Sequence, residues 1–316
     1  MIRFAVAVPV FIFLGSAYAQ SQGNSSLTEQ VGVNNYADVE QLAELGESKS
    51  HIAQHGSGNR ATLYQRSLAG ENFSSIEQMG ETNQISVYQD SAGSNNSSAY
   101  QNGIGNQISI VQGYGALNNS SVYQNGSGNV ARTSQFGEPG NNFSRIEQWG
   151  EDNSASVGQA GATISTVTQI GFGNSALVSQ QLVGSSKEAH VTVHGNVNNV
   201  EIVQWNDVND SAVAITGDAN VAKTLQTGEN SSGVWIVGRS NAVDLEQHGY
   251  NTSTVYVDGA NNTVSSRQIG EHTTATVDIE GAENTISTTQ AGNTGLGDTA
   301  QVTVQGNSNR ATVTQQ

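Results

Sequence analysis

Cysteine is absent from the 316-residue chain, and proline occurs only at Pro9 and Pro139. Without cysteine the fold cannot use disulfides, so hydrogen bonding and packing must hold it together. Proline removes a hydrogen-bond donor from a strand, whereas glycine serves tight turns. Two prolines beside 36 glycines therefore favour a long array of strands joined by turns.

Charge is also scarce in this sequence. Charged residues make up 12% of the chain, against about 25% in typical soluble domains. The formal net charge of −16 is spread thinly, and the 11 Lys and Arg residues form no basic stripe that could hold phosphates. We therefore expect no nucleic-acid partner. Membrane insertion is not expected either, because no later segment is long and apolar enough to span a bilayer.

The N-terminus has the features of a secretory signal peptide over residues 1–19. Arg3 supplies a positive charge, residues 4–14 are mostly apolar, and Ala17-Tyr18-Ala19 matches the small-x-small cleavage pattern. The mature chain is then predicted to begin at Gln20 and to be secreted. The alternative is that this segment forms a buried N-terminal helix.

An internal repeat runs through the rest of the chain, in the pattern Gly-x-x-Asn-x5-Gln. Its turn glycines are Gly32, Gly56, Gly80, Gly103, Gly126, Gly150, Gly171, Gly195, Gly217, Gly238, Gly259, Gly281 and Gly306. Its Asn and Gln pairs are Asn35 and Gln41, Asn59 and Gln65, Asn83 and Gln89, Asn106 and Gln112, Asn129 and Gln135, Asn153 and Gln159, Asn174 and Gln180, Asn198 and Gln204, Asn220 and Gln226, Asn241 and Gln247, Asn262 and Gln268, Asn284 and Gln290, and Asn309 and Gln315. Disordered chains do not keep such a register.

Each repeat divides into two arms around its turn glycine. In the second arm, residues 59–65, the alternation places Asn59, Ala61, Leu63 and Gln65 on one face. A period of two is that of a β-strand, and the apolar members assign this face to the interior. The first arm alternates likewise, and Gly and Asn suit the turn between the arms. Residues 20–316 are thus predicted to form one all-β solenoid of about thirteen strand-turn-strand rungs, in two stacked, parallel, in-register sheets.

The inward Asn and Gln side chains are predicted to form amide ladders along the solenoid. Stacking in register places equal side chains above one another, so each amide can donate to one neighbouring rung and accept from the other. A buried amide without partners would cost about 1–3 kcal/mol. Mutual satisfaction therefore explains these residues better than ligand binding does.

The position two residues before each turn glycine divides the chain into two halves. It is Gln in the first seven repeats, from Gln30 to Gln169, and aliphatic in the last six, from Val193 to Val304. We expect the seven N-terminal repeats to be Gln-laddered at this position and the six C-terminal repeats to have a more aliphatic core. The repeat register continues across the change, so a single domain is predicted.

The repeat resembles the curlin repeat of bacterial curli fibre subunits, over essentially the whole mature chain. One copy shows the motif clearly through Asn142, Ser144, Ile146, Gln148, Gly150, Asn153, Ala155 and Gln159. The resemblance implies a secreted functional amyloid at the cell surface, nucleated at the outer membrane and serving biofilm matrix and adhesion. Its implied partners are other copies of the chain, other curlin-like subunits and the secretion and nucleation machinery. The chain departs from the family in its larger number of repeats and its late aliphatic substitutions.

Both ends of the repeat array have the composition of bare strands, without proline or a charged cap, so we expect head-to-tail polymerisation. An enzyme is the main competing class. However, acidic residues such as Glu77 and Glu147 fall at outward positions, and no catalytic pair recurs. Histidines spaced four apart, such as His51 and His55, would lie more than about 12 Å apart on a strand, too far to share a metal ion. No cofactor is expected, and a monomeric secreted adhesin or an accessory or nucleator subunit remains the alternative function.

Overall fold

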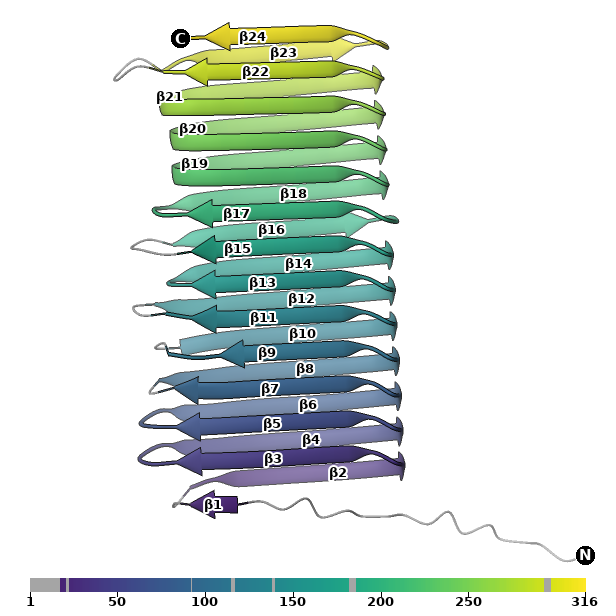
Figure 1. The fold of residues 1–316 in the computed structure, drawn as a ribbon, viewed down its shortest axis with the longest axis vertical. Helices are drawn as coiled ribbons and strands as arrows, with labels where there is room; N and C mark the ends of the chain where they lie inside the picture. The colour runs from purple at the N-terminus through teal and green to yellow at the C-terminus, as the bar shows by residue number, and fades with distance from the viewer. Residues whose placement is uncertain are drawn as a thin grey trace, which may run out of the picture.

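The computed structural model describes residues 18–20, 23–91, 93–114, 117–137, 140–181, 186–292 and 297–316. It is a parallel β-solenoid of about twelve turns, and the described residues contain no helix. This confirms the predicted all-β class and the stacked, in-register sheets. Figure 1 shows the rungs stacked along one axis, with β1 and β24 at opposite ends of the stack. The predicted signal peptide lies largely outside the described residues.

The first arms form one layer of the solenoid and the second arms form the other (Figure 1). The first layer contains β2 (Ser25–Val33), β4 (Glu47–Ser57), β6 (Glu71–Glu81), β8 (Ser94–Ile104), β10 (Leu117–Ser127), β12 (Asn141–Glu151), β14 (Thr163–Phe172), β16 (Lys187–His194), β18 (Asn209–Asp218) and β23 (Thr299–Gln305). The second contains β1 (Tyr18–Gln20), β3 (Tyr36–Ala43), β5 (Arg60–Ser67), β7 (Gln84–Ser91), β9 (Gln107–Gln112), β11 (Val130–Phe136), β13 (Ser154–Ala160), β15 (Ser175–Gln181), β17 (Asn199–Trp205), β22 (Thr285–Ala291) and β24 (Arg310–Gln315).

Three long strands belong to both layers: β19 (Val221–Arg239), β20 (Ala242–Ala260) and β21 (Thr263–Ala282). Each is the second arm of one repeat and the first arm of the next. They bend without a break at Gly228, Gly249 and Gly270, where φ is positive. The connection between consecutive repeats is thus reduced here to a glycine bend that keeps the strand pairing intact.

Equivalent residues of successive repeats pair directly across the parallel strands. Gly32 of β2 pairs with Gly56 of β4, and this pattern continues to Gly259 and Gly281 near the other end. The register shifts once, where the extra residue His272 forms a bulge opposite Tyr250 and Asn251. Pairing also continues from β14 to β16, where Gln169 lies beside Val193.

The interior follows the alternation of the sequence. In β5, Ala61, Leu63 and Gln65 are buried, whereas Arg60 is exposed. Aliphatic side chains from both layers meet in one continuous core that extends along the stack. No helix of the described part of the chain is long and apolar enough to cross a membrane.

The turn between the arms requires glycine for two reasons, which Gly126 illustrates. Its φ of 127° lies in a region that other residues rarely adopt, and a Cβ there would lie 1.9 Å from the carbonyl oxygen of Gly150 in the next rung. Two residues later the chain again has a positive φ, at Gly128 in this rung and at Asp152 in the next. The strict glycine of the repeat therefore reflects both the turn and the close stacking of rungs.

Candidate assembly site

The second-arm Gln residues form one uninterrupted ladder through the whole stack. The Nε2 of each Gln donates to the Oε1 of the Gln in the next rung, over 2.8–3.1 Å, from Gln41 to Gln315. All members from Gln41 to Gln290 are buried. Every donor therefore points toward the C-terminal end of the solenoid, which gives the ladder a direction.

The same Gln amides also tie the two layers together. The Nε2 of Gln65 donates to the carbonyl of Lys49 in the facing first arm, 3.2 Å away, and the spacing of sixteen residues recurs in every rung. Both amide hydrogens of an interior Gln are thus used, one along the stack and one across it. Since an unpaired buried amide is costly, a smaller or apolar residue at this position would leave several groups unsatisfied.

The Asn residues that follow the turn form a second ladder with the opposite direction. Each Asn donates from its main-chain N–H and from Nδ2 to the Oδ1 of the Asn in the preceding rung, from Asn35 to Asn309. The Nδ2 to Oδ1 distances are 2.9–3.3 Å. The Nδ2 also reaches the carbonyl of the turn glycine in the following rung, as from Asn59 to Gly80 over 2.9 Å. Asn therefore fixes the turn as well as the stacking.

All thirteen turn glycines lie at the bend between the arms with φ between 105° and 138°. The first-arm Gln residues add a third ladder in the N-terminal half. It runs from Gln30 to Gln169 with Nε2 to Oε1 distances of 2.6–3.0 Å, and it ends beneath Val193. In later rungs Val193, Ile215 and Ile236 fill this position and are buried.

The sequence reasoning missed a further buried polar row at the start of the first arm. Asn72, Asn95, Asn118 and Asn142 are buried there, and Asn118 and Asn142 each donate over 2.9 Å to the Asn of the preceding rung. Asn also occupies this position in the first repeat and in three later ones, but Ser, Thr, Lys and Asp occupy it in the other five, so the repeat pattern is less regular here.

Lys187 is the exception within this row, because it is a cationic side chain that is only 1% exposed. Burial lowers the pKa of its amine, and the carboxylate of Asp207 opposes that shift. The C-terminal half therefore contains one cationic group placed where most rungs hold an uncharged side chain.

The two ends of the stack carry unlike hydrogen-bonding groups. At the C-terminal end, Gln315 Nε2 donates to the Thr299 carbonyl and keeps a second N–H, while Asn309 Oδ1 accepts from no described residue. At the N-terminal end, Gln41 Oε1 accepts from no described residue, and the main-chain N–H of Asn35 has no described Asn below it. Each open donor at one end thus matches an open acceptor at the other.

The outer strand edges are covered only in part. The described pairings of β24 and β23 lie on their inner sides alone, and β2 pairs only with β4. In contrast, β1 pairs with β3 over three residues, from Tyr18 with Glu40 to Gln20 with Leu42. The sequence reasoning missed this short strand, which contains the predicted cleavage site after Ala19.

The outer faces of the solenoid carry aromatic and charged side chains at equivalent positions. Tyr64 stacks on Tyr88 with ring centroids 4.8 Å apart, and Arg60 lies over the ring of Tyr36 at 4.9 Å. Ion pairs such as Lys49 with Glu47 are exposed, so each contributes little to stability. Among the described residues no group of three or more His, Asp or Glu side chains is placed to hold a metal ion.

Comparison of the chain with models of known protein families finds no match, and comparison with curated proteins finds none either.

Proposed function

We propose that this chain is a structural, non-catalytic subunit that stacks head to tail into an extracellular fibre. In this proposal it is a curlin-like functional amyloid that serves biofilm matrix and adhesion. The observation that carries the proposal is the complementarity of the two end rungs. An uncovered strand edge templates pairing with another chain, and head-to-tail contacts of one chain with the next generate an open filament.

The proposed joint is the contact between the last rung of one copy and the first rung of the next. It continues the second-arm Gln ladder and the Asn ladder from one copy to the next. Gln315 Nε2 of one copy donates to Gln41 Oε1 of the next, and the Asn35 N–H of that next copy donates to Asn309 Oδ1. Each bond repeats a contact found inside the solenoid, at 2.8 Å for Gln290 with Gln315. The joint thus needs no new type of interaction, and it satisfies end groups that water alone would otherwise solvate.

The outer surface of the end rungs supports the same register. Arg310 and Tyr36 hold the same place in their repeats as Arg60 does in the second rung. Arg60 already lies over one face of the Tyr36 ring. In a head-to-tail stack, Arg310 of the preceding copy lies against the other face, where a cation–π contact contributes about 0.5–1 kcal/mol at an exposed site.

The proposals on export and on partner proteins rest on the sequence and not on the contact between copies. The predicted signal peptide implies secretion, and the curlin resemblance implies nucleation at the outer membrane together with other curlin-like subunits. The short strand β1 contributes to this proposal, because cleavage after Ala19 removes two of the three residues that cover β3. Processing would then enlarge the free edge to which the next copy adds.

One observation favours a second candidate function, that of an accessory or nucleating subunit in a mixed fibre. At a joint between two identical copies, Val304 of one copy lies beneath Gln30 of the next, so the side-chain Oε1 of Gln30 gains no donor. An unpaired carbonyl of this kind costs about 1–3 kcal/mol when buried. A partner whose last rung carries Gln at this position would fit the N-terminal end better. A monomeric secreted adhesin is the alternative function that requires no contact with another copy or with a partner subunit.

The test is time-resolved thioflavin fluorescence with electron microscopy on the purified chain from Gln20 to Gln316, diluted from denaturant. Sigmoidal growth that preformed seeds accelerate, ending in unbranched fibrils, is the result the proposal expects. Growth only after addition of a Gln-ended curlin-like subunit would favour the accessory role. A stable strand-rich monomer at high concentration, without fibrils under either condition, would leave the monomeric adhesin.

A further inference from the structure

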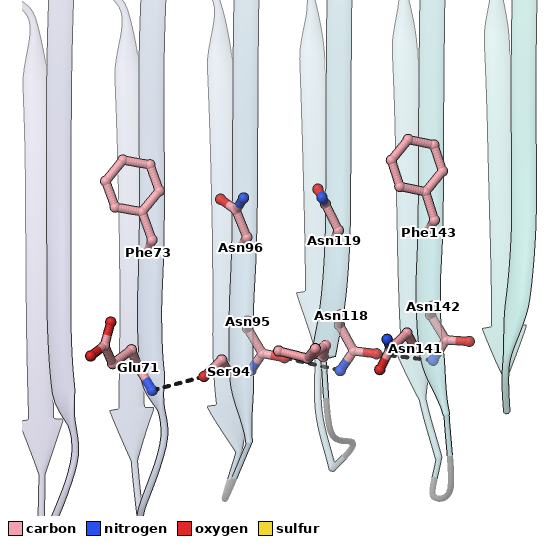
Figure 2. Close-up of a pocket in the computed structure, with 11 residues that line it drawn as sticks. Glu71, Phe73, Ser94, Asn95, Asn96, Asn118, Asn119, Asn141, Asn142 and Phe143 are labelled. Carbon is pink, nitrogen blue, oxygen red and sulfur yellow. Dashed lines mark hydrogen bonds between the residues drawn. The ribbon is translucent and has the colours of Figure 1, made fainter.

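A groove crosses the start of the first arm on four successive rungs, β6, β8, β10 and β12 (Figure 2). Phe73, Asn96, Asn119 and Phe143 occupy one outward position in these rungs and pair directly in that order. The groove has a volume of about 520 Å³. The Phe73 and Phe143 side chains are 45% and 37% exposed and form the two ends of the groove along the solenoid axis. The amides of Asn96 and Asn119 lie between them.

The main chain beneath this row is held rigidly by the second-arm Gln ladder. Gln89 donates to the carbonyl of Phe73, and Gln112 donates to that of Asn96, each over 3.0 Å. The carbonyls of Asn119 and Phe143 are bound in the same way, over 2.9 and 2.8 Å. The four outward side chains are therefore presented at a fixed spacing, which lowers the entropy lost when a ligand binds.

The lining of the groove combines amide side chains with three exposed apolar ones, Phe73, Leu117 and Phe143, and is nearly uncharged. Asn96 and Asn119 are exposed, and each amide offers two donors and an acceptor oxygen. The buried Asn95 also lines the groove, and its Nδ2 has no hydrogen-bond partner among the described residues. Among the described lining residues only Glu71 is charged, and it lies on the rung that also carries Phe73.

We propose that this groove binds an uncharged chain of hexopyranose sugars that runs along the solenoid axis. Neighbouring hydroxyls of a sugar can bond the carbonyl oxygen and the NH2 of one Asn side chain at once, and the C–H faces of sugar rings pack on exposed aromatic rings. Three strand spacings separate Phe73 from Phe143, about 14 Å in all, so the row accommodates a short oligosaccharide segment. This binding activity goes beyond fibre assembly and does not depend on it.

The composition of the groove disfavours other ligand classes. An anionic polysaccharide would meet Glu71 and a chain of formal net charge −16, and none of the described lining residues is a cation that could offset this charge. An apolar peptide segment would contact Phe73, Leu117 and Phe143, but it would also bury the exposed Asn96 and Asn119 amides without partners, which carries a desolvation penalty.

The test measures binding of two neutral β-1,4-linked tetrasaccharides, fully N-acetylated chitotetraose and mannotetraose, to the chain from Gln20 to Gln316. Isothermal titration calorimetry gives the affinity. Every variant is measured at the same subunit concentration and in the same state, either soluble or assembled. Phe73→Ala and Phe143→Ala should each weaken binding about tenfold, and Asn119→Asp should do the same by removing donors and adding charge. All three positions are outward, so circular dichroism should stay unchanged.

Matched controls separate the groove from general surface effects. Phe172→Ala removes an exposed phenyl ring at the turn, and Asn199→Asp adds the same charge on the opposite layer. Both should leave binding unchanged. Failure of both neutral sugars to bind, equal losses in the controls, or stronger binding of tetragalacturonate would each overturn the proposal, whether or not the chain forms fibres.

Discussion

Replacing one interior rung of the second-arm Gln ladder tests whether the ladder stabilises the solenoid. Gln159 is buried, accepts from Gln135 over 2.9 Å, and donates to Gln180 over 3.1 Å and to the Phe143 carbonyl over 2.8 Å. Gln159→Leu keeps the size of the side chain but removes all three bonds. The Gln180 and Phe143 oxygens then lose their donors, and Gln135 loses its acceptor along the stack.

The expected loss follows from these three groups. Each buried polar group left unpaired costs about 1–3 kcal/mol. Gln135 keeps its bond to the Asn119 carbonyl, so we take about 1–2 kcal/mol per group, or about 3–6 kcal/mol for the three. The apolar side chain of Leu recovers about 1–2 kcal/mol of that loss through burial. We therefore expect the free energy of unfolding to fall by about 2–4 kcal/mol, measured by guanidinium denaturation followed with circular dichroism.

Gln315→Leu is the matched control at the open end of the same ladder. Gln315 is only half-buried, and Gln290 keeps bonds to the Thr274 and Asp298 carbonyls without it. We expect a stability loss below about 1 kcal/mol, since water replaces the lost partners, but slower seeded elongation because the joint loses its Gln donor. Equal stability losses in the two variants, or no loss in Gln159→Leu, would refute the reasoning that the interior ladder stabilises the stack.

Two further predictions concern the turn and the buried cation. Gly126→Ala should lower the free energy of unfolding by about 2–4 kcal/mol, because φ is 127° and the new Cβ meets the Gly150 carbonyl. Gly161→Ala, where φ is 99° but the space is open, should cost only about 1–2 kcal/mol in the same denaturation assay. Because burial lowers the pKa of Lys187, the folded chain releases this proton first, so stability should rise with pH from that lowered pKa toward the usual 10.5. Lys187→Met should raise stability near neutral pH and flatten that rise in pH-dependent melting; an unchanged slope would contradict the assignment.

The sequence was sufficient to predict the period, the inward face and the class of fold. The strict spacing of Gly, Asn and Gln sets the rung, and period-two alternation such as that of Asn59, Ala61 and Leu63 places one face inside. These features repeat thirteen times, so local ambiguity in any one rung has little effect. The abrupt change from Gln169 to Val193 likewise marks where the third ladder ends.

The directions of the ladders could not be predicted from the sequence. A side-chain amide can place its oxygen toward either neighbour, and only the surrounding carbonyls decide which arrangement satisfies every group. In the structure, the facing carbonyl of Lys49 accepts from Gln65, while the Gly80 carbonyl accepts from Asn59. The two ladders consequently run in opposite directions, which gives each end of the solenoid both a donor and an acceptor.

The groove and β1 were missed for a different reason. Phe73, Asn96, Asn119 and Phe143 differ from one another and lie 23 or 24 residues apart, so no repeat pattern marks them as one surface. Only the register of the stacked strands brings them into a row. The strand β1 overlaps the end of the segment that we predict to be a signal peptide, so no feature of the sequence indicated that it would pair with β3.

Disulfide trapping of the joint between copies tests the central claim most directly, because the chain contains no cysteine of its own. Asp38 and Thr312 hold equivalent outward positions in the first and last rungs, so stacking places them about 4.8 Å apart across the joint, within reach of a disulfide. The account predicts that Asp38→Cys with Thr312→Cys gives a ladder of covalent multimers under oxidation, whereas Asp38→Cys with Thr303→Cys, on the other layer, does not. Equal crosslinking in both double variants, or none in either when fibres are present, would contradict head-to-tail stacking in register.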